Sequence, residues 1–129
     1  MNETILSDFA FLVSETDSKG KIRFANDDFC KIAGYSLEEL IGKPHNIVRH
    51  PDMPRKAFKS LWETVQRGEI WTGYVKNKVK NGGYYWVYAT VYPFDSCDGG
   101  RGFLSCRRKA HKNEINEAEL LYKEWKRSE

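Results

Sequence analysis

The sequence predicts an α+β fold, in which a five-stranded antiparallel sheet carries short helices on one face and is followed by a C-terminal amphipathic helix. Three observations predict it. Two short alternating segments open the chain, apolar residues at helical spacing fill its middle, and three longer alternating segments come one after another near its end. Strands joined by tight turns pair antiparallel, and helices grouped between them cover one face of the sheet.

The first two strands are expected over residues 9–15 and 21–25, with a turn over residues 17–20 between them. The first segment alternates, and one of its faces carries Phe9, Phe11 and Val13. Because the connection is short, the two strands should pair as a hairpin.

Three helices are expected next. Asn26 stands where a helix N-cap would, and Gly34 stops that helix. Ser36 begins a capping box for a second short helix, which Gly42 ends. Pro54 suits the first position of a third helix, because the N–H that proline lacks is not needed there. The apolar stripe of that helix is Phe58, Leu61, Trp62 and Val65.

The last part of the chain predicts a meander of three strands and a helix. The strands are expected over residues 70–79, 84–94 and 102–108, and the turn Lys80-Asn81-Gly82-Gly83 is a strong hairpin signal. From about His111 the pattern is helical and charged, with an apolar stripe of Ile115, Ala118, Leu121, Tyr122 and Trp125. That stripe needs a partner, either this sheet or a second subunit.

Composition favours one domain in a reducing compartment. The 129 residues suit one core, with residues 1–110 forming the domain and residues 111–129 a C-terminal helix or linker. A net charge of +3 is too mild to indicate nucleic-acid binding, and no apolar run approaches the roughly 18 residues that cross a bilayer. Cys30, Cys97 and Cys106 have no metal-ligand spacing and cannot all pair.

The strand faces indicate where a ligand would lie. In strand 84–94 one face carries Tyr84, Trp86, Tyr88 and Tyr92, and the other carries Val87, Ala89 and Val91. The small face leaves space for a ligand, and Trp86 should pack outside, against the terminal helix or a partner. In strand 70–79 one face carries Trp71, Gly73, Val75, Asn77 and Val79. An amide on that face needs a hydrogen-bond partner, either a polar ligand edge or a backbone group of the core.

The segment from Gly42 to Pro54 is the most informative stretch. It holds three prolines, two histidines, Arg49 and Asp52 between two apolar-periodic segments. Prolines restrain the backbone, so a stiff, non-helical frame presents these polar side chains. No nucleophile or metal constellation accompanies them. We therefore expect a cavity wall and not the active site of an enzyme.

At this point the motifs resemble those of PAS domains. Asn26 before the first helix, the sequence FCKIAGYSLEELIGKP and the later KNGGYYWV follow that family's pattern over residues 5–108. The more specific stretches are PHNIVRHPDMP and AFKSLWETVQRGEIWTGYVKNKVKNG, which resemble the flavin-binding PAS domains of bacterial aerotaxis and energy-taxis receptors. The resemblance implies a PAS fold, a bound FAD and a signalling role in which the redox state of the flavin is reported.

Eight residues match ligand-associated positions of those domains. They are Asn26, Arg49, His50, Asp52, Phe58, Trp71, Asn77 and Arg107. The resemblance implies that Phe58 and Trp71 lie against the planar isoalloxazine and that Asn77 meets its uracil-like edge. Arg107, on the last strand, would feel the ring and pass a change to the C-terminal helix.

Plainer interpretations stand beside these for the loop. Arg49 and His50 would meet the FAD phosphates or ribityl chain, or they would lock the loop through Asp52. An Arg49–Asp52 ion pair that only braces the loop is an equal alternative. For His45 we favour hydrogen bonding within the loop over ligand contact. Trp62 is expected to be a core residue.

The resulting expectation is a cytoplasmic, non-enzymatic sensor that binds FAD and signals to a chemoreceptor or a kinase-type protein. Residues alone do not separate FAD from FMN. A haem-binding gas sensor with His45 or His50 as axial ligand is one alternative. A ligand-free PAS module that dimerises through its terminal helix or outer sheet face is another. With no cysteine between Cys30 and Cys97, the photoadduct of light-sensing flavin domains is not expected.

Overall fold

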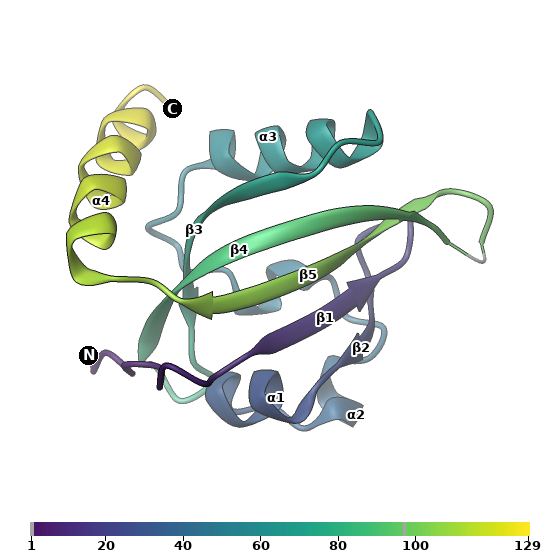
Figure 1. Ribbon diagram of the computed structural model, residues 1–129, viewed down its shortest axis with the longest axis horizontal. Coiled ribbons are helices and arrows are strands. Elements are labelled where there is room, and N and C mark those ends of the chain that lie inside the picture. The colour runs from purple at the N-terminus through teal and green to yellow at the C-terminus, as the bar shows by residue number, and fades with distance from the viewer. Residues whose placement is uncertain (1, 97) are drawn as a thin grey trace.

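A five-stranded antiparallel sheet in the order β2-β1-β5-β4-β3 forms the centre of the computed structural model (Figure 1). The model describes residues 2–96 and 98–129, so the prediction for Cys97 lies outside the described residues. The elements are β1 (Leu12–Thr16), β2 (Ile22–Ala25), α1 (Asp27–Ala33), α2 (Leu37–Leu40), the 3-10 helix η1 (His45–Val48), α3 (Arg55–Gln66), β3 (Trp71–Lys78), β4 (Tyr84–Asp95), β5 (Arg101–Lys109) and α4 (Lys112–Arg127). The predicted α+β class and antiparallel sheet are confirmed.

The first strand begins later than the sequence predicted. β1 starts at Leu12, and its buried face is Leu12, Ser14 and Thr16. Phe9 and Phe11 precede the strand and are 93% and 51% exposed. The error arose because the apolar alternation of residues 9–13 faces outward, while small polar residues line the inside. Buried hydroxyls at Ser14 and Thr16 indicate polar space beneath the sheet.

The short helices are held by the local signals that predicted them. The Asn26 carboxamide accepts the N–H of Phe29 at 3.1 Å and so caps α1. Gly34 ends α1 with φ of 84°, a left-handed conformation that favours glycine. Ser36 and Glu39 form the reciprocal capping box of α2. Pro54 was predicted to be the first helical residue of α3. It is instead the N-cap of that helix.

α3 packs over the sheet through Ala57, Leu61 and Val65, which are buried. Opposite this helix, β3 and β4 pair Gly73 with Ala89 and Val75 with Val87. Small residues on the covered face let α3 pack close to β3 and β4. β1 and β5 add buried polar side chains: Ser14, Thr16, Ser105 and Arg107.

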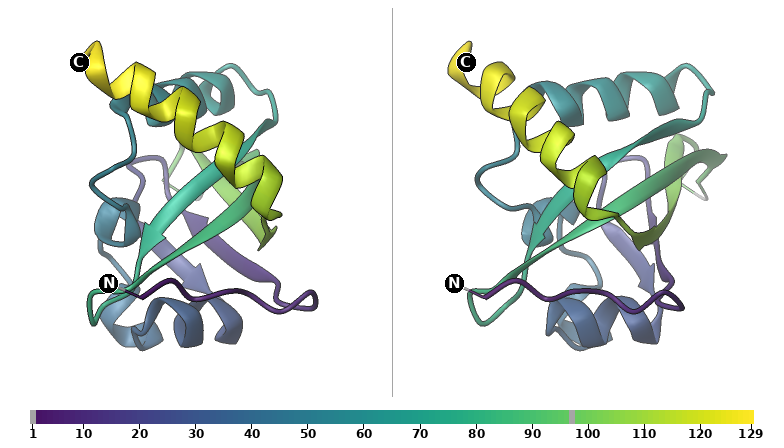
Figure 2. Two further views of the ribbon diagram at one scale, coloured as in Figure 1. Left: turned by 90° about the vertical axis from the view of Figure 1, so that its left-hand side faces the viewer. Right: turned by 60° about the vertical axis from the view of Figure 1, so that its left-hand side comes forward.

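α4 lies on the opposite face of the sheet, where it crosses β3 and β4 (Figure 2). The Tyr122 ring stacks on Trp86 with centroids 6.4 Å apart, and its hydroxyl donates to the Tyr74 carbonyl at 2.6 Å. At the end of α4, the Glu129 carboxylate accepts the backbone N–H of Lys56 at 3.2 Å. The expectation that Trp86 packs against the terminal helix is therefore confirmed.

A search of the described residues for a helix both long and apolar enough to cross a membrane found none.

Candidate cofactor site

A cavity of about 260 Å³ lies between the covered face of the sheet, α3 and the loop that contains η1. Its lining residues are Lys19, Gly20, Pro44, His45, Asn46, Val48, Arg49, Phe58, Leu61, Trp62, Asn77, Phe103 and Arg107. Four of the eight predicted site residues meet here: Arg49, Phe58, Asn77 and Arg107. The first half of the proline- and histidine-rich segment forms one wall, as its position in the chain had predicted.

Asn77 and Arg107 are joined at the floor of the cavity. A guanidinium only donates and the Val48 carbonyl only accepts, so the Asn77 amide is oriented with its oxygen on Arg107. In that orientation the oxygen accepts from Arg107 Nη1 at 2.8 Å and the nitrogen donates to Val48 at 3.1 Å. The Tyr85 hydroxyl lies 3.3 Å from the oxygen end of the amide, on the same side as Arg107. Both alternatives weighed for Asn77 thus apply in part, since it meets a backbone group and also lines the cavity.

Arg107 is a buried cation that has only neutral partners among the described residues. Its side chain is 2% exposed, and Nε donates to the Ser105 hydroxyl at 2.8 Å. Burial lowers the pKa of Arg107 to about 10, so the guanidinium stays charged at neutral pH. An isolated buried charge costs several kcal/mol unless charge or acceptors offset it. Arg107 therefore favours negative charge in the cavity beside it.

Arg49 supplies a second cation at the cavity wall. Its guanidinium lies 3.6 Å from the ring centroid of Phe58, a close cation–π contact. Its Nε is buried without a hydrogen-bond partner among the described residues. An orphaned buried donor that lines a cavity is the expected counterpart of a ligand acceptor. The bracing ion pair anticipated between Arg49 and Asp52 is not formed, because Asp52 pairs with Lys76 at 2.9 Å.

His45 lines the same cavity as a neutral imidazole. Its Nε2 lies 2.9 Å from the Ser14 hydroxyl, and Phe29 and Phe103 pack against its ring. Burial first, then the charges of Arg107 and Arg49, lower the pKa of His45 to about 3. We had favoured hydrogen bonding within the loop for His45. Its partner is instead β1, since Ser14 is one of the small polar residues on the covered face.

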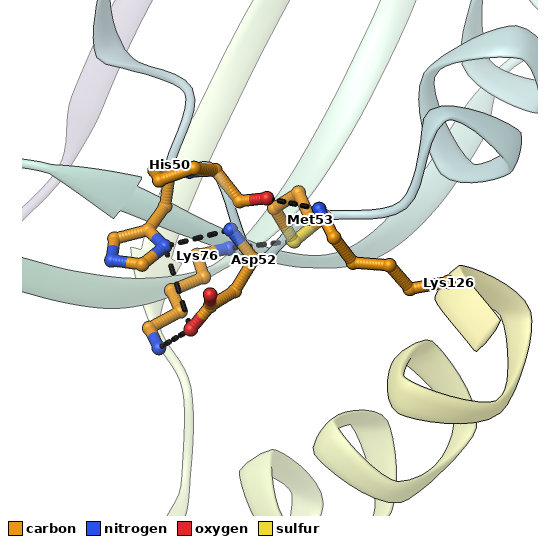
Figure 3. Close-up of polar contacts among 6 residues, drawn as sticks. His50, Asp52, Met53, Lys76 and Lys126 are labelled. Atoms are coloured by element: carbon orange, nitrogen blue, oxygen red, sulfur yellow. Dashed lines mark hydrogen bonds and ion pairs between the residues drawn. The ribbon is translucent and has the colours of Figure 1, made fainter. Parts of the chain in front are cut away.

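Two predicted residues face away from the cavity, toward α4. The His50 ring accepts the N–H of Asp52 at 3.0 Å, and the Asp52 carboxylate binds Lys76 on β3 (Figure 3). The hydrogen bond from Lys76 is the main reason why the pKa of Asp52 is lowered. Burial, followed by the nearby Lys76 charge, lowers the pKa of His50. Lys126 of α4 reaches the Pro51 carbonyl, so this half of the segment ties the loop to α4.

Asn26 and Trp71 also lie outside the cavity lining. The Asn26 carboxamide bonds to backbone groups of Phe11, Val13 and Phe29, so its oxygen and nitrogen both join α1 to β1. Trp71 folds over Gly73 and donates from its indole nitrogen to the Ser60 hydroxyl at 3.3 Å. The indole therefore closes the gap between β3 and α3 beside the cavity.

Sequence reasoning missed three features of this site. The first is Tyr85, which is fully buried on the same face of β4 as Val87 and Ala89. The alternation that placed Val87 and Ala89 inside also implied this position for Tyr85, but it was not named. Trp62, expected to be core, lines the cavity edge-on to Phe103. The face of β1 with Ser14 could have been found by asking which strand alternates with small hydroxyl residues, because polar space needs polar walls.

Residues 22–106 match the model of the PAS fold family, which is two thirds of the chain. The chain belongs to the PAS fold family. The Escherichia coli (strain K12) aerotaxis receptor is 48% identical to this PAS domain over 120 residues, which is 93% of the chain but 24% of the receptor. The nitrogen fixation regulatory protein of Klebsiella pneumoniae is 29% identical over 90 residues, or 70% of the chain and 18% of that protein. The chain thus spans a quarter or less of these relatives.

Solved structures agree with the fold. The structure of a light-oxygen-voltage domain studied with a flavin analogue superposes on this chain with a TM-score of 0.69 at 23% identity. The match covers 88% of this chain and 85% of that one. The light-state structure of the Aureochrome1 LOV photoreceptor gives a TM-score of 0.69 at 17% identity, covering 87% and 92%. At this identity the likeness establishes the fold of this PAS domain.

Proposed function

We propose that this PAS domain is a cytoplasmic sensor that binds FAD and reports the redox state of the flavin to a chemotaxis-type signalling partner. One observation carries the proposal. Two arginines line a cavity that the described residues provide with no carboxylate, and one of them, Arg107, is wholly buried. The likeness to the aerotaxis receptor supports the same conclusion.

The cavity chemistry fits an isoalloxazine ring. Phe58, Trp62 and Phe103 offer aromatic surface to a planar heterocycle. Asn77 offers an amide to an edge that both donates and accepts, and the orphaned Nε of Arg49 offers a donor. The cavity volume of about 260 Å³ is slightly below the lower end of the range for ligand pockets, roughly 300 Å³. The ring system would occupy the cavity, and the rest of FAD would extend beyond it.

A bound flavin would supply reversible electron transfer. The Arg107 guanidinium would then stabilise negative charge next to Asn77. His45 is neutral and can take up a proton, although burial and two arginines oppose this until the cavity gains negative charge. The groups that hold the ring are thus the same groups that respond to its charge.

The response has a short path to α4. Arg107 lies on β5, which ends at Lys109, and α4 begins at Lys112. A change in the charge next to Arg107 would shift β5 relative to its neighbour β4. α4 packs on β4 through the stacking of Tyr122 on Trp86. Such a shift biases α4 between two packings, and a signalling partner reads the population of each. The proposed partner is a chemoreceptor or a kinase-type protein.

Colour and mass test the cofactor. The purified protein should show flavin absorbance, and mass analysis of the ligand released by denaturation should give FAD and not FMN. Asn77→Ala and Arg107→Ala should each reduce flavin retention, whereas Asn81→Ala, an exposed turn residue, should not. A protein that stays colourless after incubation with FAD, or that shows haem bands, contradicts the proposal. So does a flavin-loaded protein whose α4 exchanges amide hydrogens at the same rate in both redox states.

A further inference from the structure

A further cavity, of about 310 Å³, lies on the other face of the sheet from the candidate cofactor site. Its lining comes from the loop after Arg49, from β3 and β4, and from α4. Figure 3 draws four of its lining residues, which are Asp52, Met53, Lys76 and Lys126. Among the described residues, none lines both cavities, so the two sites are separate.

The floor of this cavity is apolar and buried. Met53 is 4% exposed, Trp86 is 5% exposed and Tyr122 is 8% exposed. The planes of the Trp86 and Tyr122 rings are only 15° apart, so they form a stacked pair. Aromatic rings and a thioether make a polarisable surface that suits a planar apolar body. The volume is at the lower end of the range for small-molecule pockets, roughly 300–1,000 Å³, which favours a ligand of one or two rings.

The rim of the cavity is cationic. Of the six charged residues that line it in the described part of the chain, the four basic ones outnumber the two acidic ones: Lys76, Lys123, Lys126 and Arg127 against Asp52 and Glu119. The Lys76 ammonium pairs with the Asp52 carboxylate at 2.9 Å. Three cations then remain against Glu119. Neither Lys123 nor Arg127 forms an ion pair with any described residue.

Two neighbouring ionisable groups do not cancel this excess. The Glu129 carboxylate lies 3.5 Å from Arg55 Nε, so its charge already has a partner. His50 stays neutral at pH 7, because burial and then the charge of Lys76 lower its pKa more than Asp52 raises it. The rim therefore attracts anions.

The helix itself explains only part of the rim. Lys126 and Arg127 stand in the last turn of α4, where cations also stabilise the carbonyl end of a helix. Lys123 lies one turn earlier, at a spacing of three and four residues from the other two. Residues at that spacing share one helix face, which here is the face that carries Tyr122 and lines the cavity.

We propose that this cavity binds a small organic anion, whose apolar ring packs on Met53, Trp86 and Tyr122 and whose carboxylate meets Lys123 and Arg127. Such a ligand would contact the loop through Met53 and α4 through the two cations. It would therefore hold α4 against the sheet. Binding requires no flavin in the other cavity.

A matched pair of probes tests the site on the intact 129-residue chain. 2-Naphthoate carries the ring and the charge, and 2-naphthamide has nearly the same shape without the charge. Met53 is one of two methionines in the sequence, so its ¹³C-labelled methyl signal is readily assigned with Met53→Leu. Naphthoate should shift this signal through the ring current, and naphthamide should bind about fivefold more weakly at low salt.

Reading the titration at Met53 keeps the two cavities apart. The candidate cofactor site also offers arginines and aromatic rings, but Met53 does not line it. Equal affinity for naphthoate and naphthamide overturns the proposal, because the rim would then contribute nothing. Acetate that binds as tightly as naphthoate also contradicts it, since the apolar floor would then have no role. So does a Met53 methyl signal that stays in place at millimolar naphthoate.

Variants of α4 complete the test. Lys123→Gln and Arg127→Gln should each weaken naphthoate about threefold and leave naphthamide unchanged. Lys112→Gln is the matched control, because it removes the same charge from the exposed start of α4, outside the cavity lining. With naphthoate bound, the amides of α4 should exchange more slowly. Equal losses in all three variants would show a general effect of net charge and would contradict the site, as would unchanged exchange in α4.

Discussion

The Asn77 amide oxygen accepts a hydrogen bond from the buried guanidinium of Arg107 at 2.8 Å. This contact links β3 to β5 across the covered face of the sheet, with β4 between them. It brings the only wholly buried arginine among the described residues to the floor of the cavity. A buried guanidinium with only neutral partners favours negative charge nearby, and the first prediction follows from this.

Arg107→Met should make the reduction potential of the proposed flavin more negative. Removing a buried positive charge destabilises the electron-rich reduced ring, and each tenfold loss corresponds to about 59 mV for one electron. A shift of at least that size is expected in a redox titration. Arg108→Met is the matched control, because Arg108 is exposed on the opposite face, 4.5 Å from the Tyr88 ring. Equal shifts in the two variants would contradict a specific role for Arg107.

His45 should make the fold sensitive to acid. Its pKa is lowered to about 3, whereas an unfolded histidine titrates near 6.5. Between those values the histidine is protonated in the unfolded state and neutral in the folded state. The contribution of His45 to the free energy of unfolding is therefore fully present above pH about 6.5, and it falls by up to about 1.4 kcal/mol per pH unit as the pH drops toward 3. The unfolding free energies of wild type and His45→Gln should therefore converge between pH 7 and pH 4. A constant difference over that range would refute the assignment.

Gly73→Ala should destabilise the protein through Trp71. A Cβ at residue 73 would lie 2.5 Å from the indole ring, closer than packing allows. We expect a loss of roughly 1–3 kcal/mol in urea denaturation. In a Trp71→Ala background the same change should become neutral or stabilising, since alanine suits a strand better than glycine. If Gly73→Ala lowers the free energy of unfolding equally with and without the Trp71 indole, the strain does not come from that ring.

Tyr122→Phe should loosen α4 and leave the cavity intact. The change removes the hydroxyl that donates to the Tyr74 carbonyl and keeps the ring stacked on Trp86. A loss of about 1 kcal/mol is expected, with faster amide exchange throughout α4. Tyr92→Phe serves as the control, because Tyr92 is 39% exposed and pairs with Leu104 of β5. If α4 exchanges as slowly as in wild type, the hydroxyl does not hold the helix.

Local rules predicted the elements of this fold well. Asn26, Gly34 and the capping box at Ser36 act within a few residues, so the sequence shows them directly. The faces of β4 followed from alternation, because one set of side chains is bulky and the other small. Where a signal depends on what lies across the sheet, as for residues 9–13, the apolar pattern alone gave the wrong limits for the strand.

The site was harder to predict because it depends on partners distant in the chain. Asp52 follows Arg49 closely, yet it binds Lys76 on β3, since the loop turns outward after Arg49. His45 meets Ser14, 31 positions away, and no local pattern indicates that pair. The resemblance to a family brought Arg49, Phe58, Asn77 and Arg107 to one list, and the structure adds that they surround one cavity.

The first turn of α3 has no side-chain cap of its own, and the carboxylate of Glu129 meets the N–H of Lys56 there. Two residues later, Phe58 stands in the cavity wall. A displacement of the C-terminal end of α4 would therefore act on the cavity wall through the first turn of α3, without passing through the sheet. A change at the cavity wall would act on the end of α4 through the same contact.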